Sequence, residues 1–311
     1  MATLVTGAGG FVGRSVVRAL RAKGAPVVAI DANLSMFEAE RGLRLVEGDL
    51  VDPAVRRAAL DGEIRSLIHL AAVPGGAAEA DPGLSRRVNI DATLDLLEEA
   101  ARAGKAPRVV FASTIAVFGD PLPAEGVDDA TPLAPRMIYG AHKAMMEVAV
   151  ATLSRRGQID GVSLRLPGIL ARPKGPSGMK SAFMSDLFHA MAAGEPFVSP
   201  VSPGATMWLM SVERAADNIL HALTLDTAFA PPSRALTLPA LRVTMQALAQ
   251  AVADATKQPS ASVAYRPDAV LEAGFGAQPP LKTPAADRAG FVHDGGIQDL
   301  VARALKGITT G

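Results

Sequence analysis

The first half of the chain alternates short apolar runs with longer segments in which apolar residues recur at helical spacing. Near-continuous apolar runs are typical of strands that are covered on both faces of a parallel sheet. The pattern predicts such strands at residues 2–6, 27–30, 43–46, 66–70, 108–112 and 162–166. It predicts helices between them at residues 12–23, 54–60, 84–103 and 138–155. Strands that alternate with helices indicate an α/β fold, a Rossmann-type doubly wound parallel sheet.

The pattern changes after residue 166. A stretch rich in glycine and proline is followed by helical patterns at 181–193 and 212–223, with a strand-like run at 206–210 between them. Short, mixed segments follow from residue 230 onward. We therefore expect two parts: an NAD-binding Rossmann domain over 1–166, with 206–229 returning to it, and a smaller C-terminal substrate lobe over 167–205 and 230–311.

Composition narrows the class of protein. The 311 residues include 31 basic and 31 acidic side chains, whereas a protein that neutralises a nucleic-acid backbone is expected to be basic. The chain has no cysteine, which excludes disulfides, thiolate metal sites and a cysteine nucleophile. No apolar run is long enough to span a membrane, and no signal peptide is visible. We expect a cytoplasmic protein with no metal, nucleic-acid or membrane partner.

The first strand runs into a glycine-rich turn and then into a helix. The glycines are Gly7, Gly10 and Gly13, in the spacing G-x-x-G-x-x-G. Such a turn lets backbone N–H groups approach a pyrophosphate, and the positive end of the helix dipole favours its charge. An ordinary βα turn can carry the same glycines. The order strand, turn, helix is what favours a dinucleotide site.

Asp31 follows the second predicted strand. A carboxylate at this place binds the hydroxyls of the adenosine ribose and repels the 2′-phosphate of NADP. No Arg or Lys follows before Arg41. The sequence therefore favours NAD over NADP as the cofactor.

Tyr139 and Lys143 are four residues apart in a predicted helix and share one of its faces. A phenol has an ordinary pKa near ~10, and a nearby ammonium lowers that pKa toward the range of a useful base. Thr114 follows the fifth strand, at the sheet edge where such folds bind ligands. A surface Tyr–Lys pair and a strand-closing Thr are the plain alternatives. The combination predicts Tyr139 as acid/base, Lys143 as its tuning group and Thr114 as a substrate ligand.

With these motifs in order, the chain resembles the extended short-chain dehydrogenase/reductase family. Gly48-Asp49-Leu50, His69-Leu70-Ala71-Ala72 and Val88-Asn89 are further marks of that family. The resemblance implies an NAD-dependent oxidoreductase with Thr114, Tyr139 and Lys143 as catalytic residues. It also implies a homodimer formed through the helices around 84–103 and 138–155. The cofactor contacts that it implies are Gly7, Gly10, Phe11, Val12, Gly13, Asp31, Asp49, Leu50, Ala71, Ala72, Asn89, Tyr139, Lys143, Pro167 and Ile169.

A narrower resemblance concerns the substrate. Residues 76–81, 139–145, 164–173 and 208–211 are similar to a branch of the family that oxidises a small sugar acid, D-erythronate, at the carbon next to its carboxylate. It implies a 2-keto acid product and a substrate site that includes Gly76, Thr114 and Tyr139. Arg172 lies in the loop after the sixth strand, and its planar guanidinium suits the substrate carboxylate. A solvated loop residue is the alternative for Arg172.

Two other functions stay open at this point. A nucleotide-sugar epimerase or dehydratase uses the same fold with tightly bound NAD, although such relatives generally carry Asn where this chain has Gly168. A non-catalytic dinucleotide sensor would not need the Thr114, Tyr139 and Lys143 set. His69 is expected to pack at a strand end rather than bind a metal, and Trp208 lines either a substrate pocket or the core.

Overall fold

The computed structural model describes residues 1–103, 106–119, 121–174, 180–259 and 262–309. The chain divides into two compact units, each made of segments that are far apart in the sequence. The first unit comprises Met1–Val117, Leu133–Leu166 and Ala216–Thr237. The second comprises Phe118–Pro132, Pro167–Ala215 and Leu238–Gly311.

A seven-stranded sheet in the order β10-β6-β5-β4-β1-β2-β3 forms the centre of the first unit. All of its neighbouring strands are parallel. The order extends from β1 in both directions, so the predicted doubly wound α/β fold is confirmed. The carboxyl ends of its strands therefore lie at one edge of the sheet. The strands are β1 Ala2–Thr6, β2 Val27–Asp31, β3 Leu43–Glu47, β4 Ile64–His69, β5 Arg108–Thr114, β6 Asp160–Leu166 and β10 Ala235–Thr237.

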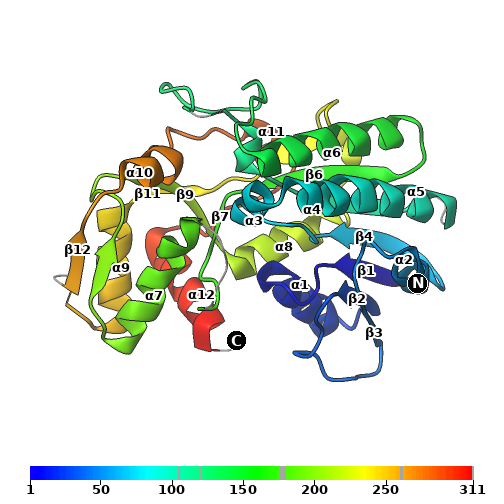
Figure 1. Ribbon diagram of the computed structural model, residues 1–311, viewed down its shortest axis with the longest axis horizontal. Helices are drawn as coiled ribbons and strands as arrows, with labels where there is room; N and C mark the ends of the chain where they lie inside the picture. The colour runs from blue at the N-terminus through cyan, green and yellow to red at the C-terminus, as the bar shows by residue number, and fades with distance from the viewer. Residues whose placement is uncertain (104–105, 120, 175–179, 260–261, 310–311) are drawn as a thin grey trace. The chain divides into compact units, whose positions relative to one another are not determined.

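Helices cover both faces of this sheet, with α5 and α6 along one face and α1 on the other (Figure 1). An apolar core joins Phe111 of β5 to Leu96 of α5 and Val150 of α6. Asp52 caps α2, because its carboxylate accepts the Ala54 N–H at 2.7 Å. The helices are α1 Phe11–Ala22, α2 Pro53–Leu60, α3 Gly75–Ala80, α4 Pro82–Arg86, α5 Thr93–Ala103, α6 Ile138–Arg155 and the first-unit part of α8 Val212–Ala222; a 3-10 turn spans Ile115–Val117.

The helix predicted at 84–103 is not continuous. It is divided into α4, a π-helical segment at Arg87–Ala92 and α5. The Thr93 hydroxyl donates to the Val88 carbonyl, five residues earlier, at 3.0 Å. A single π-helical turn widens a helix locally and is frequent at functional sites. Hydrophobic periodicity does not distinguish such a turn from an α-helix, so the pattern missed it.

The second unit contains two small sheets. In the first, β9 (Thr206–Ser211) lies between β7 (Gly168–Leu170), which is parallel to it, and β11 (Leu241–Thr244), which is antiparallel. In the other, β8 (Phe197–Ser199) pairs with β12 (Val263–Tyr265). An apolar core that includes Phe188, Leu209, Leu248 and Leu300 lies among the helices. These helices are α7 Phe183–Ala193, α9 Met245–Thr256 and α12 Ile297–Thr309, which lie side by side in Figure 1, with the shorter α10 Ala269–Phe275 and α11 Pro284–Arg288; 3-10 turns span Lys180–Ala182 here and Thr227–Phe229 in the first unit.

The boundaries of the units differ from the expected ones. Residues 206–229 were expected to return to the Rossmann domain, but Thr206–Ser211 is the central strand of the second unit's sheet. The returning segment is instead Ala216–Thr237, which ends in β10. Residues 118–132 also belong to the second unit, where the Val127 N–H donates to the Pro280 carbonyl at 2.9 Å. A buried apolar strand has the same pattern in either sheet, so the sequence alone did not assign it.

Candidate active site

The turn between β1 and α1 leaves no space for side chains at its glycines. Gly7 has φ +67°, in the left-handed region, and a Cβ there would lie 2.6 Å from the Ala71 nitrogen. A Cβ on Gly13 would fall on the Gly7 carbonyl oxygen, so α1 approaches the turn as closely as backbone allows. Gly10 is the N-cap of α1, followed by Phe11 and Val12, and no side chain caps this helix. The open start of α1 suits a pyrophosphate.

Asp31 ends β2 and lies against the same turn. Its Oδ2 accepts the Gly9 N–H at 3.0 Å, and its Oδ1 accepts the Asn33 N–H at 3.1 Å. The glycine spacing does not single out Gly9, because Gly9 stands outside the three-residue repeat. A Cβ on Gly9 would fall on the Asn33 carbonyl oxygen, which explains why a glycine is needed there. The turn therefore holds the Asp31 carboxylate beside the start of α1.

Asp49 and Leu50 lie in the loop that follows β3. The Asp49 carboxylate accepts the Val51 N–H at 2.9 Å, and Leu50 is buried in the first unit's core. The Leu50 carbonyl accepts a hydrogen bond from Arg56 Nη1 at 2.9 Å. Arg56 is itself buried and paired with Glu99 at 3.1 Å. This loop is thus fixed from α2 and α5.

His69 ends β4 and forms a directed chain of hydrogen bonds. Its Nδ1 lies 2.8 Å from Thr6 Oγ1, and its Nε2 lies 3.0 Å from Thr93 Oγ1. Thr93 donates its own proton to Val88, so it accepts from Nε2–H, and Thr6 donates to Nδ1. Burial lowers the pKa of His69 to about 3, and the charge of Lys143 acts in the same direction. His69 is neutral with both nitrogens engaged, which is the packed role that was expected.

Ala71, Ala72 and Asn89 surround the segment that follows β4. The Ala71 N–H donates to Thr6 Oγ1 at 3.3 Å. Asn89, in the π-helical segment, accepts the Val73 N–H at 2.7 Å and donates to the Val73 carbonyl at 2.9 Å. Its amide also donates to Ser85 Oγ at 3.1 Å. The Asn89 side chain therefore holds the backbone just beyond Ala72.

Tyr139 and Lys143 stand one turn apart on α6. Lys143 is 2% exposed, and its Nζ lies 5.8 Å from the centroid of the Tyr139 ring and 4.6 Å from that of Phe111. Nζ donates to the Ala112 carbonyl on β5 at 2.8 Å. Burial lowers the pKa of Lys143 to about 7, against the opposing effect of the Glu147 carboxylate. Burial therefore disfavours the ammonium form of Lys143, and the Glu147 carboxylate favours it.

Thr114 ends β5, two residues beyond the acceptor of Lys143. Its Oγ1 accepts the Ala116 N–H at 3.1 Å, which leaves the hydroxyl proton available for donation. The first residues of α6 pack tightly against the 3-10 turn at Ile115–Val117, because a Cβ on Gly140 would fall on the Ala116 carbonyl oxygen. The structure thus brings Thr114, Tyr139 and Lys143 to one end of β5 and α6.

Gly76 lies on α3, the helix that fixes the start of α6. Glu79, one turn after Gly76, accepts the N–H of Ile138 at 2.7 Å, directly before Tyr139. Met137, the N-cap of α6, gives no side-chain cap, so a carboxylate from another helix takes that place. The contact joins residues 59 positions apart in the sequence, so no local motif predicts it.

Pro167, Ile169 and Arg172 belong to the second unit. Pro167 precedes β7, and Ile169 lies within that strand. The Arg172 N–H donates to Ser185 Oγ at 3.0 Å, and its carbonyl accepts from His189 Nε2 at 2.6 Å, so α7 holds the backbone there. Part of the loop that follows, residues 175–179, lies outside the described residues.

Trp208 is a core residue of the second unit. It is 1% exposed, and its indole Nε1 donates to the Pro279 carbonyl at 2.8 Å. Of the two interpretations that the sequence left open, the structure supports core packing.

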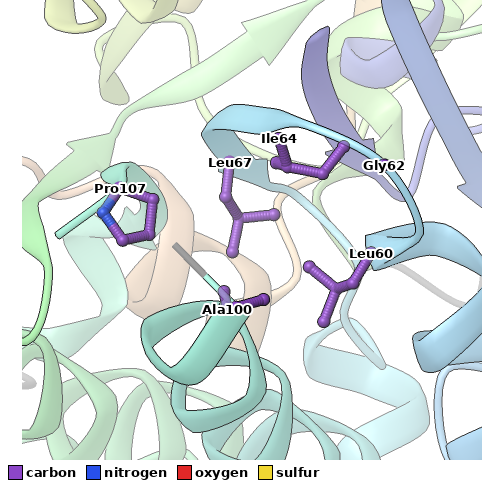
Figure 2. Close-up of a pocket in the computed structure, with 7 residues that line it drawn as sticks. Leu60, Gly62, Ile64, Leu67, Ala100 and Pro107 are labelled. Atoms are coloured by element: carbon purple, nitrogen blue, oxygen red, sulfur yellow. The ribbon is translucent and has the colours of Figure 1, made fainter. Parts of the chain in front are cut away.

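The pocket in Figure 2 lies at the opposite edge of the first unit's sheet, where β4 and β5 begin. Its lining consists of apolar side chains, glycine and backbone, with no group that could transfer a proton. It therefore offers no catalytic chemistry. The lining residues are Leu60, Gly62, Ile64, Leu67, Ala100, Ala103 and Pro107.

Two further absences apply to the described residues alone. Among them, no three His, Asp or Glu side chains gather in a way that could hold a metal ion. Likewise, none of the helices described is long and apolar enough to cross a membrane.

The first unit combines an open glycine turn, an acidic residue at the end of β2 and a buried Lys beside a Tyr. Together these features define a dinucleotide-dependent enzyme, and the residues present fit NAD. The model of the NAD dependent epimerase/dehydratase family matches residues 3–232, and the chain belongs to this family. The predicted resemblance and the NAD cofactor are confirmed.

Similar proteins narrow the class further. The chain is 38% identical to the D-erythronate dehydrogenase of Cupriavidus necator over 81% of each chain. It is 32% identical to the D-erythronate dehydrogenase of Haemophilus influenzae over 79% of each. A nucleoside-diphosphate-sugar epimerase structure from Agrobacterium tumefaciens superimposes with a TM-score of 0.87 at 29% identity, covering 97% of this chain and 92% of that one. The chain is an NAD-dependent oxidoreductase.

Proposed function

We propose that this enzyme oxidises the hydroxyl next to the carboxylate of a small sugar acid, D-erythronate or a close analogue, to the 2-keto acid. The pairing of Tyr139 with the buried Lys143 carries the proposal, because a phenol beside an ammonium can act as the proton acceptor that alcohol oxidation needs. The two D-erythronate dehydrogenases, which match about four fifths of the chain, support the choice of substrate.

Tyr139 is the proposed acid/base. Its phenolate takes the proton of the substrate hydroxyl, and the ammonium of Lys143 stabilises the phenolate. Thr114 donates its free hydroxyl proton to a substrate oxygen, since its lone pair already accepts the Ala116 N–H. These groups together orient the alcohol and hold its proton at a defined atom.

In this proposal most of the residues that hold the cofactor belong to the first unit, and Pro167 and Ile169 belong to the second. The turn at Gly7, Gly10 and Gly13 receives the pyrophosphate, and Asp31 receives the adenosine ribose. Asp49, Leu50, Ala71, Ala72 and Asn89 flank it, with Phe11, Val12, Tyr139, Lys143, Pro167 and Ile169 as the remaining proposed contacts. When bound, NAD accepts the hydrogen of the alcohol carbon as a hydride.

Gly76 and Arg172 complete the proposed substrate set. Arg172→Lys keeps the charge but loses the planar pair of donors, so we expect KM for the sugar acid to rise about tenfold, with NAD affinity unchanged. Steady-state kinetics and calorimetry with NAD check this. Lys174→Ala, a change at an exposed residue two positions later, is the matched control. Unaltered kinetics in Arg172→Lys would remove Arg172 from the site.

A nucleotide-sugar epimerase is the second candidate, favoured by the Agrobacterium tumefaciens structure. Gly168 counts against it. A Cβ there would lie 3.0 Å from Leu209 Cδ2 and 3.1 Å from the Trp208 carbonyl oxygen, so the Asn generally found in epimerase relatives would require these neighbours to shift by a few tenths of an ångström. We therefore favour the dehydrogenase.

The decisive experiment offers the purified enzyme NAD together with D-erythronate, its stereoisomers and five- and six-carbon sugar acids. We expect NAD reduction, followed by absorbance, with the four-carbon acid as the best substrate and a 2-keto acid as the product. In parallel, UDP-glucose is tested for conversion without net NAD reduction. Epimerisation of the nucleotide sugar with no oxidation of any acid would establish the second candidate instead.

We also propose a homodimer that uses α6. Met145 is 55% exposed and Val148 is 62% exposed on the same side of this helix, which is unusual for side chains of their size. A second copy of the chain would cover them. Val148→Glu should shift the protein from dimer to monomer in sedimentation, whereas Thr152→Glu further along the helix is the control. A wild-type protein that sediments as a monomer contradicts the dimer.

A further inference from the structure

A buried ionic cluster lies under α6 and takes no direct part in the proposed reaction. Glu147 on α6 accepts two hydrogen bonds from Arg165, at 2.9 Å from Nε and 2.7 Å from Nη2. It also accepts the Ser113 hydroxyl at 2.5 Å. Ser113 and Arg165 are register partners on β5 and β6. The cluster therefore joins α6 to both strands beneath it.

Joining a helix to a sheet through a buried ion pair carries a large desolvation cost. Glu147 is 3% exposed and Arg165 is 6% exposed, and apolar side chains of similar volume usually serve packing as well or better. The position of the charge offers another reason for it. Glu147 follows Lys143 by one turn on the same face of α6, and its neighbour Ser113 directly follows Ala112, the acceptor of Lys143.

We propose that Glu147 is a positioning residue that keeps the proton on Lys143, so that Tyr139 is the group that ionises. This inference rests on the proposed acid/base role of Tyr139. Tyr139 and Lys143 form a coupled pair, and the first proton to leave can come from either one. A carboxylate on the Lys143 side favours the ammonium and phenolate combination over the neutral amine and phenol.

Of the charged and titratable groups around Lys143, Glu147 is the one that determines whether Lys143 or Tyr139 loses its proton first. Tyr139 shares α6, and its ring lies 5.8 Å from Nζ. His69 of β4 also acts on Lys143, but burial lowers the pKa of His69 to about 3, so it carries no charge near neutral pH. Arg165 of β6 is bound to Glu147, and Glu147 is the charge that acts on the pKa of Lys143. The β5 contacts of Lys143 are the Phe111 ring and the Ala112 carbonyl, which are uncharged.

The chain offers a direct measurement of the ionised tyrosine. It has two tyrosines, so a Tyr265→Phe background leaves Tyr139 as the single phenol. Phenolate absorbance in the near ultraviolet is then recorded against pH, without cofactor or substrate. In this background Glu147→Gln should move the appearance of the phenolate to higher pH by about 1–2 units, as expected for charges ~6 Å apart at an effective dielectric constant of ~20.

The matched control is Glu99→Gln. Glu99 also pairs with a buried arginine, Arg56, but it lies on α5 and not beside Lys143. It should lower thermal stability without moving the phenolate titration. Because Glu147→Gln leaves Arg165 without its counter-charge, Glu147→Gln/Arg165→Met is prepared as well. This double variant removes both charges and should still move the titration to higher pH.

The outcomes separate the proposal from a purely structural role and from the proposed function. A phenolate titration that stays in place in both Glu147 variants, while they fold, overturns the proposal. A shift that matches the one in Glu99→Gln overturns it too, because any lost ion pair would then produce it. A shift in the Glu147 variants alone supports it. The titration uses no substrate, so it stands even if the enzyme fails to oxidise any sugar acid.

Discussion

The two units use buried polar side chains in different ways. In the first unit, His69, Lys143, Glu147 and Arg165 are buried at or near the carboxyl edge of the sheet, and each of them is hydrogen-bonded. In the described part of the second unit the buried titratable side chain is Asp294. It accepts the Ser211 N–H at 2.9 Å and the Ser211 hydroxyl at 2.5 Å, across 83 residues of sequence. In the first unit buried charge lies beside the candidate site, apart from Arg56, which ties α2 to α5; in the second unit it joins distant segments.

We therefore expect pH and side-chain ionisation to control the activity and stability of the first unit. Hydrogen bonds between distant segments should control the stability of the second. The largest test is Tyr139→Phe, which removes only the ionisable hydroxyl. Turnover should fall by ~10²–10⁴-fold, as is typical for loss of an acid/base. NAD affinity by calorimetry should change little, because the ring remains. Tyr265→Phe is the control, and near-normal turnover in Tyr139→Phe would show that the chemistry of the first unit is misassigned.

The next largest effect concerns acid stability. The folded protein holds His69 neutral with its pKa lowered to about 3, so unfolded chains bind a proton there between pH 6.5 and 3 that the folded protein does not. Stability should thus rise with pH over this range, and His69 should account for roughly 2 kcal/mol between pH 4.5 and 6.5. Urea unfolding at both pH values, followed by circular dichroism, measures this.

His69→Asn should be less stable at neutral pH but lose less stability on acidification. His293→Asn, at an exposed residue of the second unit, is the matched control and should leave the pH slope unchanged. An equal slope in the parent and in His69→Asn would contradict the link between buried charge and the first unit.

A third effect tests the second unit. Asp294→Ala leaves the buried N–H and hydroxyl of Ser211 without their acceptor, and each buried unsatisfied group costs about 1–3 kcal/mol. The melting temperature should fall by several degrees, with little effect on NAD affinity. Asp299→Ala, at an exposed residue of α12, is the control. If Asp294→Ala melts at a lower temperature but loses NAD binding at the same temperature as the parent, then NAD binding does not depend on the folding of the second unit.

The smallest expected effect is on cofactor choice. Asp31→Asn keeps a hydrogen-bonding side chain but removes the charge beside the glycine turn. NAD affinity should fall by roughly ten- to a hundredfold, and discrimination against NADP should relax. Kinetics with both cofactors measure it. An unaltered preference for NAD would place the recognition elsewhere.

The sequence predicted the first unit well because its signals are local. Helix α6 was predicted at its observed bounds, residues 138–155, and the six predicted strands all occur in the sheet. The strand β10 was missed, since three residues carry too little pattern. The second unit depends on distant contacts, such as Asp294 with Ser211 and Trp208 with Pro279. Periodicity reports which residues are buried but not what buries them.

The same limit applies to the candidate site. Gly7, Asp31 and Tyr139 belong to short motifs and were predicted directly from the sequence. Glu79 and Glu147 were not, because each acts across elements: Glu79 caps a helix 59 residues later, and Glu147 binds strands on either side. A residue that holds another in place has no signature in its own neighbourhood. The structure is needed to find it.

Trp208 gives the second unit an optical property that the first lacks. It is the chain's single tryptophan, and its indole is sealed in the core with its N–H bound to the Pro279 carbonyl. Its emission should therefore be blue-shifted and shielded from aqueous quenchers such as iodide for as long as that core is intact. Fluorescence then reports the second unit alone, whereas far-ultraviolet circular dichroism reports both. A red shift that precedes the loss of dichroism during unfolding would mark the second unit as the one that opens first.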